Sequence, residues 1–263
     1  MAKLEDRFQA SHPVRAKMGR ADANGISVSN PVAVEIAPDL AHIIGEFCWG
    51  SLWPRPALSI EQRSLATISI ITAQNGDFTL RGHIKSGLCL GFSPEQIIEI
   101  VIQLIFYIGA PIANTAMRLV YSVFQEQGIK VDPYRLHDPN LDPEELYRRG
   151  LDKRREIMGE GGPGDFQGGD ALDQEWERYM VEYLWGLVWT RPGLDLQSRV
   201  ICTLSAHTVI GTDRTLADYI RAARNLGLTE TQIKELFFHL TFYIGISLAR
   251  RASNIADEVF KSL

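Results

Sequence analysis

Apolar side chains recur along this chain at intervals of three and four residues, the spacing that places them on one face of an α-helix. A clear example is the set Ile97, Val101, Leu104 and Ile108. The preceding residues, 93–96, form a Ser-Pro-Glu-Gln capping box with proline at the first helical position, which indicates a helix start. Alternating apolar and polar positions, which are typical of strands, are nearly absent. The pattern predicts an all-α fold.

The sequence contains two copies of the same unit. At a shift of 136 residues, positions 47–124 align with positions 183–260 without a gap, and 28 of these 78 positions are identical. A period of this length is that of a domain and not that of a solenoid repeat. We therefore expect a tandem repeat of one helical domain, with about six helices in each copy, some of them short.

The join between the copies is predicted in a polar segment that three prolines interrupt, residues 131–143. We place the first domain at residues 1–135 and the second at residues 136–263. A glycine-rich stretch, residues 159–170, lies inside the second copy between its first and second predicted helices.

Composition and charge limit the kinds of binding partner that we expect. The 263 residues are 45% apolar and 22% charged, as in soluble globular proteins, and the net charge of −5 gives no reason to expect a nucleic-acid partner. The most apolar run, residues 97–113, contains Glu99 and Gln103 and is interrupted by glycine and proline, so we expect no membrane span. The charged N-terminus resembles no secretory signal. We expect a cytoplasmic protein.

The number and spacing of the cysteines also indicate a cytoplasmic protein. Cys48, Cys89 and Cys202 are far apart in the sequence and form no CxxC pair. An odd number of cysteines without a pattern fits a reducing environment and argues against a disulfide framework. No metal-ligand spacing of histidines or cysteines is present, so we expect no metal site.

Three ordered segments carry a resemblance to a known family. They read WGSLWPRPALSIEQRS at residues 49–64, LRGHIKSGLCLG at residues 80–91 and SPEQIIEIVIQLIFYIGAPIANTA at residues 93–116. Together they resemble the carboxymuconolactone decarboxylase family, and the second copy repeats the Trp-Arg-Pro segment. The resemblance covers nearly the whole chain, twice. It implies a six-helix domain whose fold is shared with alkylhydroperoxidase-type proteins.

The two chemistries of this fold can be separated by sequence. The thiol reductases place a CxxC motif before a histidine, and His83 fits that histidine position. However, Gly76 and Thr79 stand where the cysteines would be, and the second copy has Thr212 and Thr215. Disulfide exchange needs an attacking thiolate and a resolving thiol. Thiol peroxidase chemistry is therefore excluded at this site.

The resemblance implies a decarboxylation that needs no cofactor. A butenolide loses a carboxylate, and the lactone carbonyl accepts the electrons. Such an enzyme needs a dry pocket, a donor near the developing enolate oxygen, an acid that protonates the ring, and a cation for a second carboxylate. The expected partner is a small-molecule carboxylate.

His83 is the predicted general acid, because the ordinary histidine pKa of about 6.5 suits proton transfer near neutral pH. The alternative is a histidine at the edge of the core with a structural role. Arg55 and Arg63 are candidates for binding a substrate carboxylate. Both arginines recur in the second copy, so a structural role is an equal alternative, either through hydrogen bonds to backbone carbonyls at helix ends or through pairing with Glu61 or Glu99.

Aromatic residues supply further candidates for substrate binding. Trp49 and Trp53 lie four residues apart on one helix face and are candidate pocket walls, although core or interface packing is the commoner role of such a pair. Tyr107 is a candidate hydroxyl donor to the enolate, and Glu99 is a candidate for orienting His83 or an arginine. Both residues recur in the second copy, and for Tyr107 this favours a role in the fold.

The second copy differs at these positions. Tyr219 stands in the place of His83, His239 in that of Gln103, and His207 in that of Ile71. We expect the chemistry in the first copy, because a tyrosine with an ordinary pKa near 10 is a poor acid at neutral pH. The alternative is a rearranged second site in which His207 or His239 is the acid.

The family resemblance also implies assembly. Single-domain members form rings of six, so a tandem chain is expected to form a homotrimer that resembles a hexamer. We expect an exposed apolar patch around Trp49, Trp53 and Ile105 to be buried at that interface. The leading function is a cofactor-independent carboxy-lyase of aromatic catabolism. The alternatives are an isomerase of specialised metabolism and a non-catalytic scaffold or binding protein.

Overall fold

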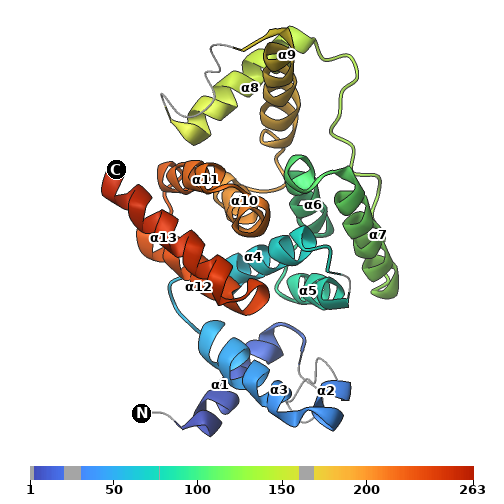
Figure 1. Ribbon diagram of the computed structural model, residues 1–263. Helices are drawn as coiled ribbons and strands as arrows, with labels where there is room; N and C mark the ends of the chain where they lie inside the picture. Colours follow the sequence, from blue (N-terminus) through green and yellow to red (C-terminus); the bar gives the residue numbers. More distant parts are fainter. Residues whose placement is uncertain (1–2, 21–30, 77, 160–168) are drawn as a thin grey trace.

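The computed structural model of this chain describes residues 3–20, 31–76, 78–159 and 169–263 (Figure 1). Within these ranges every regular element is a helix, which confirms the all-α prediction. The helices of the first copy are α1 (Leu4–Lys17), α2 (Pro31–Ile36), α3 (Pro38–Ile43), η1 (Ile44–Leu52), α4 (Ile60–Ala73), α5 (Phe78–Cys89), α6 (Pro94–Ile108) and α7 (Ala110–Glu126). Those of the second are α8 (Pro143–Met158), α9 (Ala171–Tyr179), η2 (Met180–Val188), α10 (Leu196–Ile210), α11 (Asp213–Asn225), α12 (Glu230–Ile244) and α13 (Ile246–Ser262).

The sequence repeat is a structural repeat. The π-helical segments η1 and η2 directly continue α3 and α9, so each copy has six corresponding helices among the described residues, and α2 is additional in the first copy. Most of the glycine-rich stretch, residues 160–168, lies outside the described residues. The expectation of a tandem helical repeat with about six helices per copy is confirmed.

The helix ends follow from local sequence. Ser59 caps α4 by accepting a hydrogen bond from the Gln62 backbone, and Ser93 and Thr229 cap α6 and α12 in the same way. Helix α4 ends just before Asn75, whose φ of 55° is the left-handed conformation that terminates helices. These signals were all readable in the sequence.

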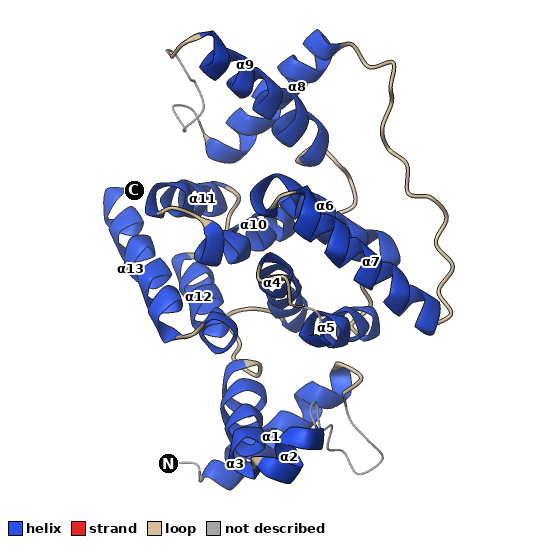
Figure 2. Ribbon diagram, turned by 45° about the vertical axis from the view of Figure 1, so that its right-hand side comes forward, coloured by secondary structure: helices blue, strands red, loops and turns tan. Residues whose placement is uncertain are grey.

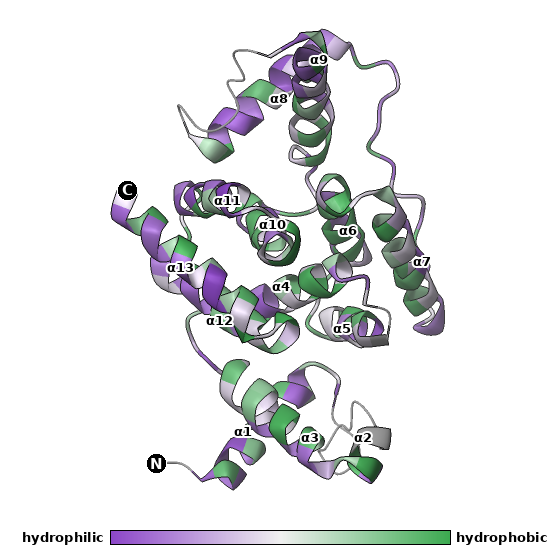
Figure 3. Ribbon diagram, in the orientation of Figure 1, coloured by the Kyte–Doolittle hydropathy of each residue, from purple (hydrophilic) through white to green (hydrophobic). Residues whose placement is uncertain are grey.

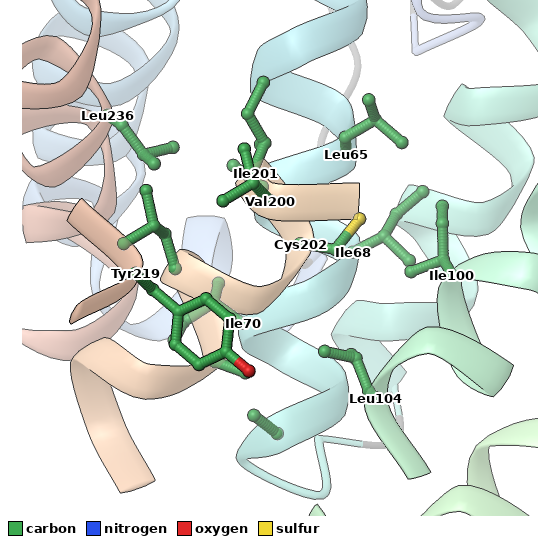
Figure 4. Packing of buried hydrophobic residues seen from close by; sticks show 14 of the residues in the cluster. Leu65, Ile68, Ile70, Ile100, Leu104, Val200, Ile201, Cys202, Tyr219 and Leu236 are labelled. Carbon is green, nitrogen blue, oxygen red and sulfur yellow. The ribbon is translucent and has the colours of Figure 1, made fainter. Parts of the chain in front are cut away.

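The two copies share one hydrophobic core. Helices α4 and α10 pack against each other at the centre, while α6 packs on α10 and α12 packs on α4 (Figures 1 and 2). Figure 4 shows Leu65 and Ile68 of α4 beside Ile100 of α6 and Ile201 of α10. Each copy therefore places one helix, α6 or α12, against the central helix of the other copy.

The first helices of the two copies lie at opposite ends of the molecule. Helix α1 packs on η1 at one end and α8 packs on η2 at the other (Figure 1). The contact of α1 with η1 is close, since a Cβ at Gly50 would lie 1.8 Å from the backbone oxygen of Arg7. Gly50 thus lets α1 approach η1, and this contact brings the end of α1 to the first copy's histidine.

The expected exposed patch around Trp49 and Trp53 is absent. Both tryptophans are buried within the single chain, at 4% and 3% exposure, and Ile105 is partly buried against the shared core. The prediction was wrong because α12 of the second copy covers the face that was expected to bind another subunit.

None of the described helices is both long and apolar enough to cross a bilayer. Figure 3 shows apolar and polar residues mixed along most helices.

Candidate active site

A cavity of about 640 Å³ lies beside His83, and its walls come from both copies. Segment η1 supplies Cys48 and Trp49, α5 supplies His83, and α12 supplies Tyr243. Arg20, just beyond the end of α1, completes this side of the lining. The cavity is thus formed only when α12 of the second copy packs on α4 of the first.

Aromatic rings hold the histidine in place. Trp49 and Trp53 stack on each other with ring centroids 5.2 Å apart, and the His83 ring lies nearly parallel to both at 6.1 Å. Tyr243 meets the His83 ring edge-on at 5.8 Å. Of the two tryptophans predicted as pocket walls, Trp49 lines the cavity, whereas Trp53 is not among the lining residues and stacks on Trp49.

The environment of His83 changes its protonation. The side chain is buried and its Nδ1 atom has no hydrogen-bond partner. Burial lowers the pKa of His83 well below 6.5, and the nearby Arg20 and His239 lower it further. The imidazole is therefore neutral at neutral pH in the protein alone, so the ordinary pKa on which the predicted acid role rested does not apply to His83.

Tyr243 is a neutral hydroxyl at neutral pH. Its oxygen accepts a hydrogen bond from Trp53 Nε1 at 3.0 Å, and burial raises its pKa well above 10. Cys48 Sγ lies 3.8 Å from the same oxygen, and burial raises the thiol pKa to about 12. Cys48 is consequently a protonated thiol and not a nucleophilic thiolate at neutral pH.

Positive charge surrounds the cavity. Arg20, Arg81 and Lys85 are among its lining residues, and no carboxylate is among the described residues that line it. Arg81 and Lys85 both pair with Glu126. Within the described chain, no group of three metal-ligating side chains comes together. The arrangement favours an anionic organic ligand.

The arginines expected to bind substrate lie elsewhere. Arg55 and Arg63 both pair with Glu235 of α12, at 2.7 and 2.8 Å, and neither lines the cavity. Neither Glu61 nor Glu99, the partners considered from sequence, makes these pairs. Glu99 instead pairs with Arg191 and Arg199 in the second copy, at 2.6 and 2.8 Å, and does not orient His83. One ion-pair cluster attaches α12 to the first copy, and the other attaches α6 to the second copy. We call α6 and α12 the crossing helices, because each packs against the central helix of the other copy.

Tyr107 belongs to a second aromatic cluster. Its hydroxyl lies 2.7 Å from that of Tyr219 and accepts a hydrogen bond from Trp189 Nε1 at 3.0 Å. His207 stacks on Tyr219 with centroids 4.9 Å apart, and burial lowers its pKa to about 4. The Tyr219 phenol, which stands in the place of His83, therefore reaches the tyrosine of α6 directly.

His239 lies in the first cluster and not in the second. Its ring meets Trp53 at 4.9 Å and its Nε2 lies 2.9 Å from Thr67 Oγ1. The alternative in which His239 is the acid of a rearranged second site is therefore wrong, because α12 crosses to the first copy. Gln103 of α6 correspondingly donates to Thr203 in the second cluster, at 3.2 Å.

Sequence reasoning missed Arg20, Cys48 and Tyr243. Tyr243 is the repeat of Tyr107, and the sequence does not show that α6 and α12 each pack against the central helix of the other copy. Arg20 follows residues 14–19, VRAKMG, which resemble residues 154–159, RREIMG, of the second copy at a shift of 140 residues. Its approach to the cavity depends on how α1 packs. A signal was present for Arg20, since its counterpart by sequence is the acidic Glu160.

Comparison with known proteins agrees with this organisation. The model of the family described as "Carboxymuconolactone decarboxylase family" matches residues 38–121 and again residues 174–258. The 4-carboxymuconolactone decarboxylase of Acinetobacter baylyi is 32% identical over 124 residues, 47% of this chain and 92% of that protein. The nitrosuccinic acid decarboxylase npaB of Metarhizium robertsii is 32% identical over 127 residues, 46% of this chain and 87% of that protein. Each of these relatives is thus similar to a segment equal to about half of this chain.

Proposed function

Because the chain belongs to the carboxymuconolactone decarboxylase family, we propose that it decarboxylates a small carboxylated lactone or a related acid in the cavity beside His83. Both named relatives are decarboxylases. The observation that carries the proposal is the single cavity that gathers an imidazole, a neutral phenol and unbalanced positive charge. A purely structural protein would have no need for this combination, and a scaffold role is favoured only where side chains fill the pocket.

The first step is loss of carbon dioxide. The bond between the ring carbon and the carboxylate breaks, and its electron pair delocalises onto the conjugated carbonyl oxygen. The Tyr243 hydroxyl donates a hydrogen bond to that oxygen as its negative charge develops. Such a donor contributes about 3–4 kcal/mol to transition-state stabilisation. Its raised pKa keeps the proton on Tyr243 throughout.

The apolar walls favour the same step. Trp49, Ile44 and Phe242 line the cavity together with the polar groups. Apolar surroundings stabilise a localised carboxylate less well than the delocalised transition state. The tryptophan pair therefore contributes by excluding water as well as by holding the histidine.

The second step is protonation of the ring carbon by His83. The free imidazole is neutral, so the proton must be taken up when substrate binds. A substrate anion beside His83 opposes the effects of burial and of Arg20, and so raises the pKa of the imidazole. His83 delivers this proton to carbon, and solvent supplies the next one. The reaction consumes one proton and releases one carbon dioxide for each substrate.

The test is turnover of 4-carboxymuconolactone followed by ultraviolet absorbance, with nitrosuccinate as the second substrate. We expect turnover of one of them by the wild type and a loss of about 10²–10⁴-fold in kcat for His83→Gln. The matched control is Tyr219→Phe, the corresponding position of the second copy, which should keep kcat within about threefold. Wild-type rates retained in His83→Gln would show that this cavity is not the reaction site.

A further inference from the structure

Arg20 differs from the other cations of the cavity. Its Nε atom donates to Ser86 Oγ at 2.7 Å, and its guanidinium lies over the Trp49 ring at 5.1 Å. One terminal nitrogen, NH2, is buried without a hydrogen-bond partner. In the described part of the chain no carboxylate pairs with Arg20. Its guanidinium is thus held in orientation by Ser86 and Trp49, and Arg20 lines the cavity with one nitrogen left unpaired.

The neighbouring cations already share a carboxylate partner. Glu126 pairs with both Arg81 and Lys85, the latter at 3.1 Å. A buried guanidinium donor without a partner is unfavourable, and a carboxylate or other oxyanion is the group that satisfies it best. The cavity therefore presents one fixed and unsatisfied cation to whatever occupies it.

Space for the guanidinium is provided by Gly82. A Cβ at this position would lie 3.0 Å from Arg20 NH2, so a larger residue would displace the side chain. The second copy has lost the arrangement at each position. Asp218 stands in the place of Gly82, Ala222 in that of Ser86, and Glu160 in that of Arg20. Glu160 lies outside the described residues. The second copy therefore lacks the arginine, the serine that binds it and the glycine that leaves room for it. Their joint absence indicates that Arg20, Ser86 and Gly82 function together.

We propose that Arg20 binds a second carboxylate of the substrate, one that is not lost, and so selects dicarboxylates. A cation held on the reacting carboxylate would stabilise the ground state more than the transition state and would slow its departure. Arg20 is therefore suited to a carboxylate that keeps its charge throughout the reaction. Turnover in this account depends on the function proposed above, but anion binding by Arg20 does not.

The binding test uses succinate as probe and the fluorescence of the cavity tryptophans or calorimetry as readout, with acetate for comparison. We expect succinate to bind the wild type more tightly than acetate, and Arg20→Gln to raise the Kd for succinate by about 10- to 100-fold. Arg20→Lys keeps the charge but loses the bond to Ser86, and should fall between the two. Arg214→Gln, an exposed arginine of α11, is the control for net charge and should leave the Kd within about twofold.

The kinetic test separates this role from a structural one. Arg20→Gln should raise KM by about 10- to 100-fold and leave kcat within about fivefold, because the contact is equal in ground and transition states. Unchanged KM and unchanged succinate binding in this variant would overturn the proposal. Succinate binding that needs Arg20, in a protein that decarboxylates neither substrate, would leave this inference standing and contradict the proposed function. If Arg20→Gln unfolds at a lower temperature, Arg20→Lys serves as the test variant.

Discussion

At the scale of single residues, one difference in sequence distinguishes the two aromatic clusters: a histidine in the first copy and a tyrosine in the second. His83 and Tyr219 occupy equivalent positions between a tryptophan pair and the tyrosine of a crossing helix. The larger Tyr219 phenol reaches the Tyr107 hydroxyl at 2.7 Å, whereas the shorter imidazole of His83 leaves a cavity in front of Tyr243. The same scaffold thus carries a cavity in one copy and a hydrogen-bonded aromatic cluster in the other.

The protonation of His83 predicts a pH dependence. Its pKa in the free protein is well below 6.5, while the reaction needs the protonated imidazole. Since kcat/KM reports the free enzyme, it should fall about tenfold for each pH unit from pH 7 to pH 9. Initial rates at low substrate concentration measure this slope. A kcat/KM that is independent of pH over this range would contradict proton donation by His83.

Arg55 should not affect substrate binding. Its guanidinium pairs with Glu235 and is 45% exposed, away from the cavity lining. We therefore expect Arg55→Gln to leave KM within about twofold and to lower the free energy of unfolding by less than about 1 kcal/mol. Steady-state kinetics and thermal unfolding check both. A large increase in KM would restore Arg55 as a substrate-binding residue.

At the scale of elements, the crossing helices α6 and α12 carry the acids that hold the copies together. Glu235 of α12 pairs with the fully buried Arg63, and Glu99 of α6 pairs with the fully buried Arg199. Removing either carboxylate leaves a buried cation without its acid. Glu235→Ala should therefore lower the free energy of unfolding by about 3–5 kcal/mol.

Denaturant unfolding measures this loss, with Glu126→Ala as the control. Glu126 forms its pairs at the surface, where ion pairs contribute up to about 1 kcal/mol. Equal effects of the two substitutions would show that the pair between α12 and α4 does not hold the copies together.

The sequence predicts features that lie within one helix. It does not predict the contacts that form because α6 and α12 each pack against the other copy. Helix caps at Ser59 and Ser93 and the shared face of Trp49 and Trp53 follow from spacing within one helix. Glu99 and Tyr107 were grouped with His83 because they belong to the same copy, yet α6 carries both of them to the second cluster. A repeat in the sequence does not reveal which copy each helix packs against.

At the scale of the whole molecule, buried histidines make stability depend on pH. The pKa of His83 and His239 is well below 6.5 and that of His207 is about 4, because burial disfavours the charged ring. Their contribution is fully present above pH 6.5 and is lost as the pH falls, since the unfolded chain binds more protons. Each histidine lowers the free energy of unfolding by up to about 1.4 kcal/mol per pH unit below pH 6.5.

Thermal unfolding between pH 7 and pH 5 measures this loss. The variant His207→Phe should flatten the dependence by the share of one histidine. A midpoint that stays constant to pH 5 would contradict the burial of these rings in a neutral form.

Assembly into a trimer remains a prediction. Exposed apolar side chains lie on equivalent helices at opposite ends of the molecule, on α3 and on α9 with η2 (Figure 1). They are Leu40, Ile43, Leu172, Trp176, Tyr179 and Tyr183. An arrangement of this kind can join one copy of the chain to the next. Light scattering should give a mass near three times the 29.5 kDa chain, and Trp176→Glu should lower it. A monomeric wild type would contradict the prediction.

The central claim is that one reaction site, shared between the copies, lies where Tyr243 of α12 meets His83 of α5. The most direct measurement compares kcat for Tyr243→Phe and Tyr107→Phe on whichever substrate the wild type turns over. The account predicts a loss of about 10²–10³-fold for Tyr243→Phe, the residue farther away in the sequence, and less than about threefold for Tyr107→Phe. A larger loss for Tyr107→Phe, the tyrosine in the same copy as His83, would contradict it.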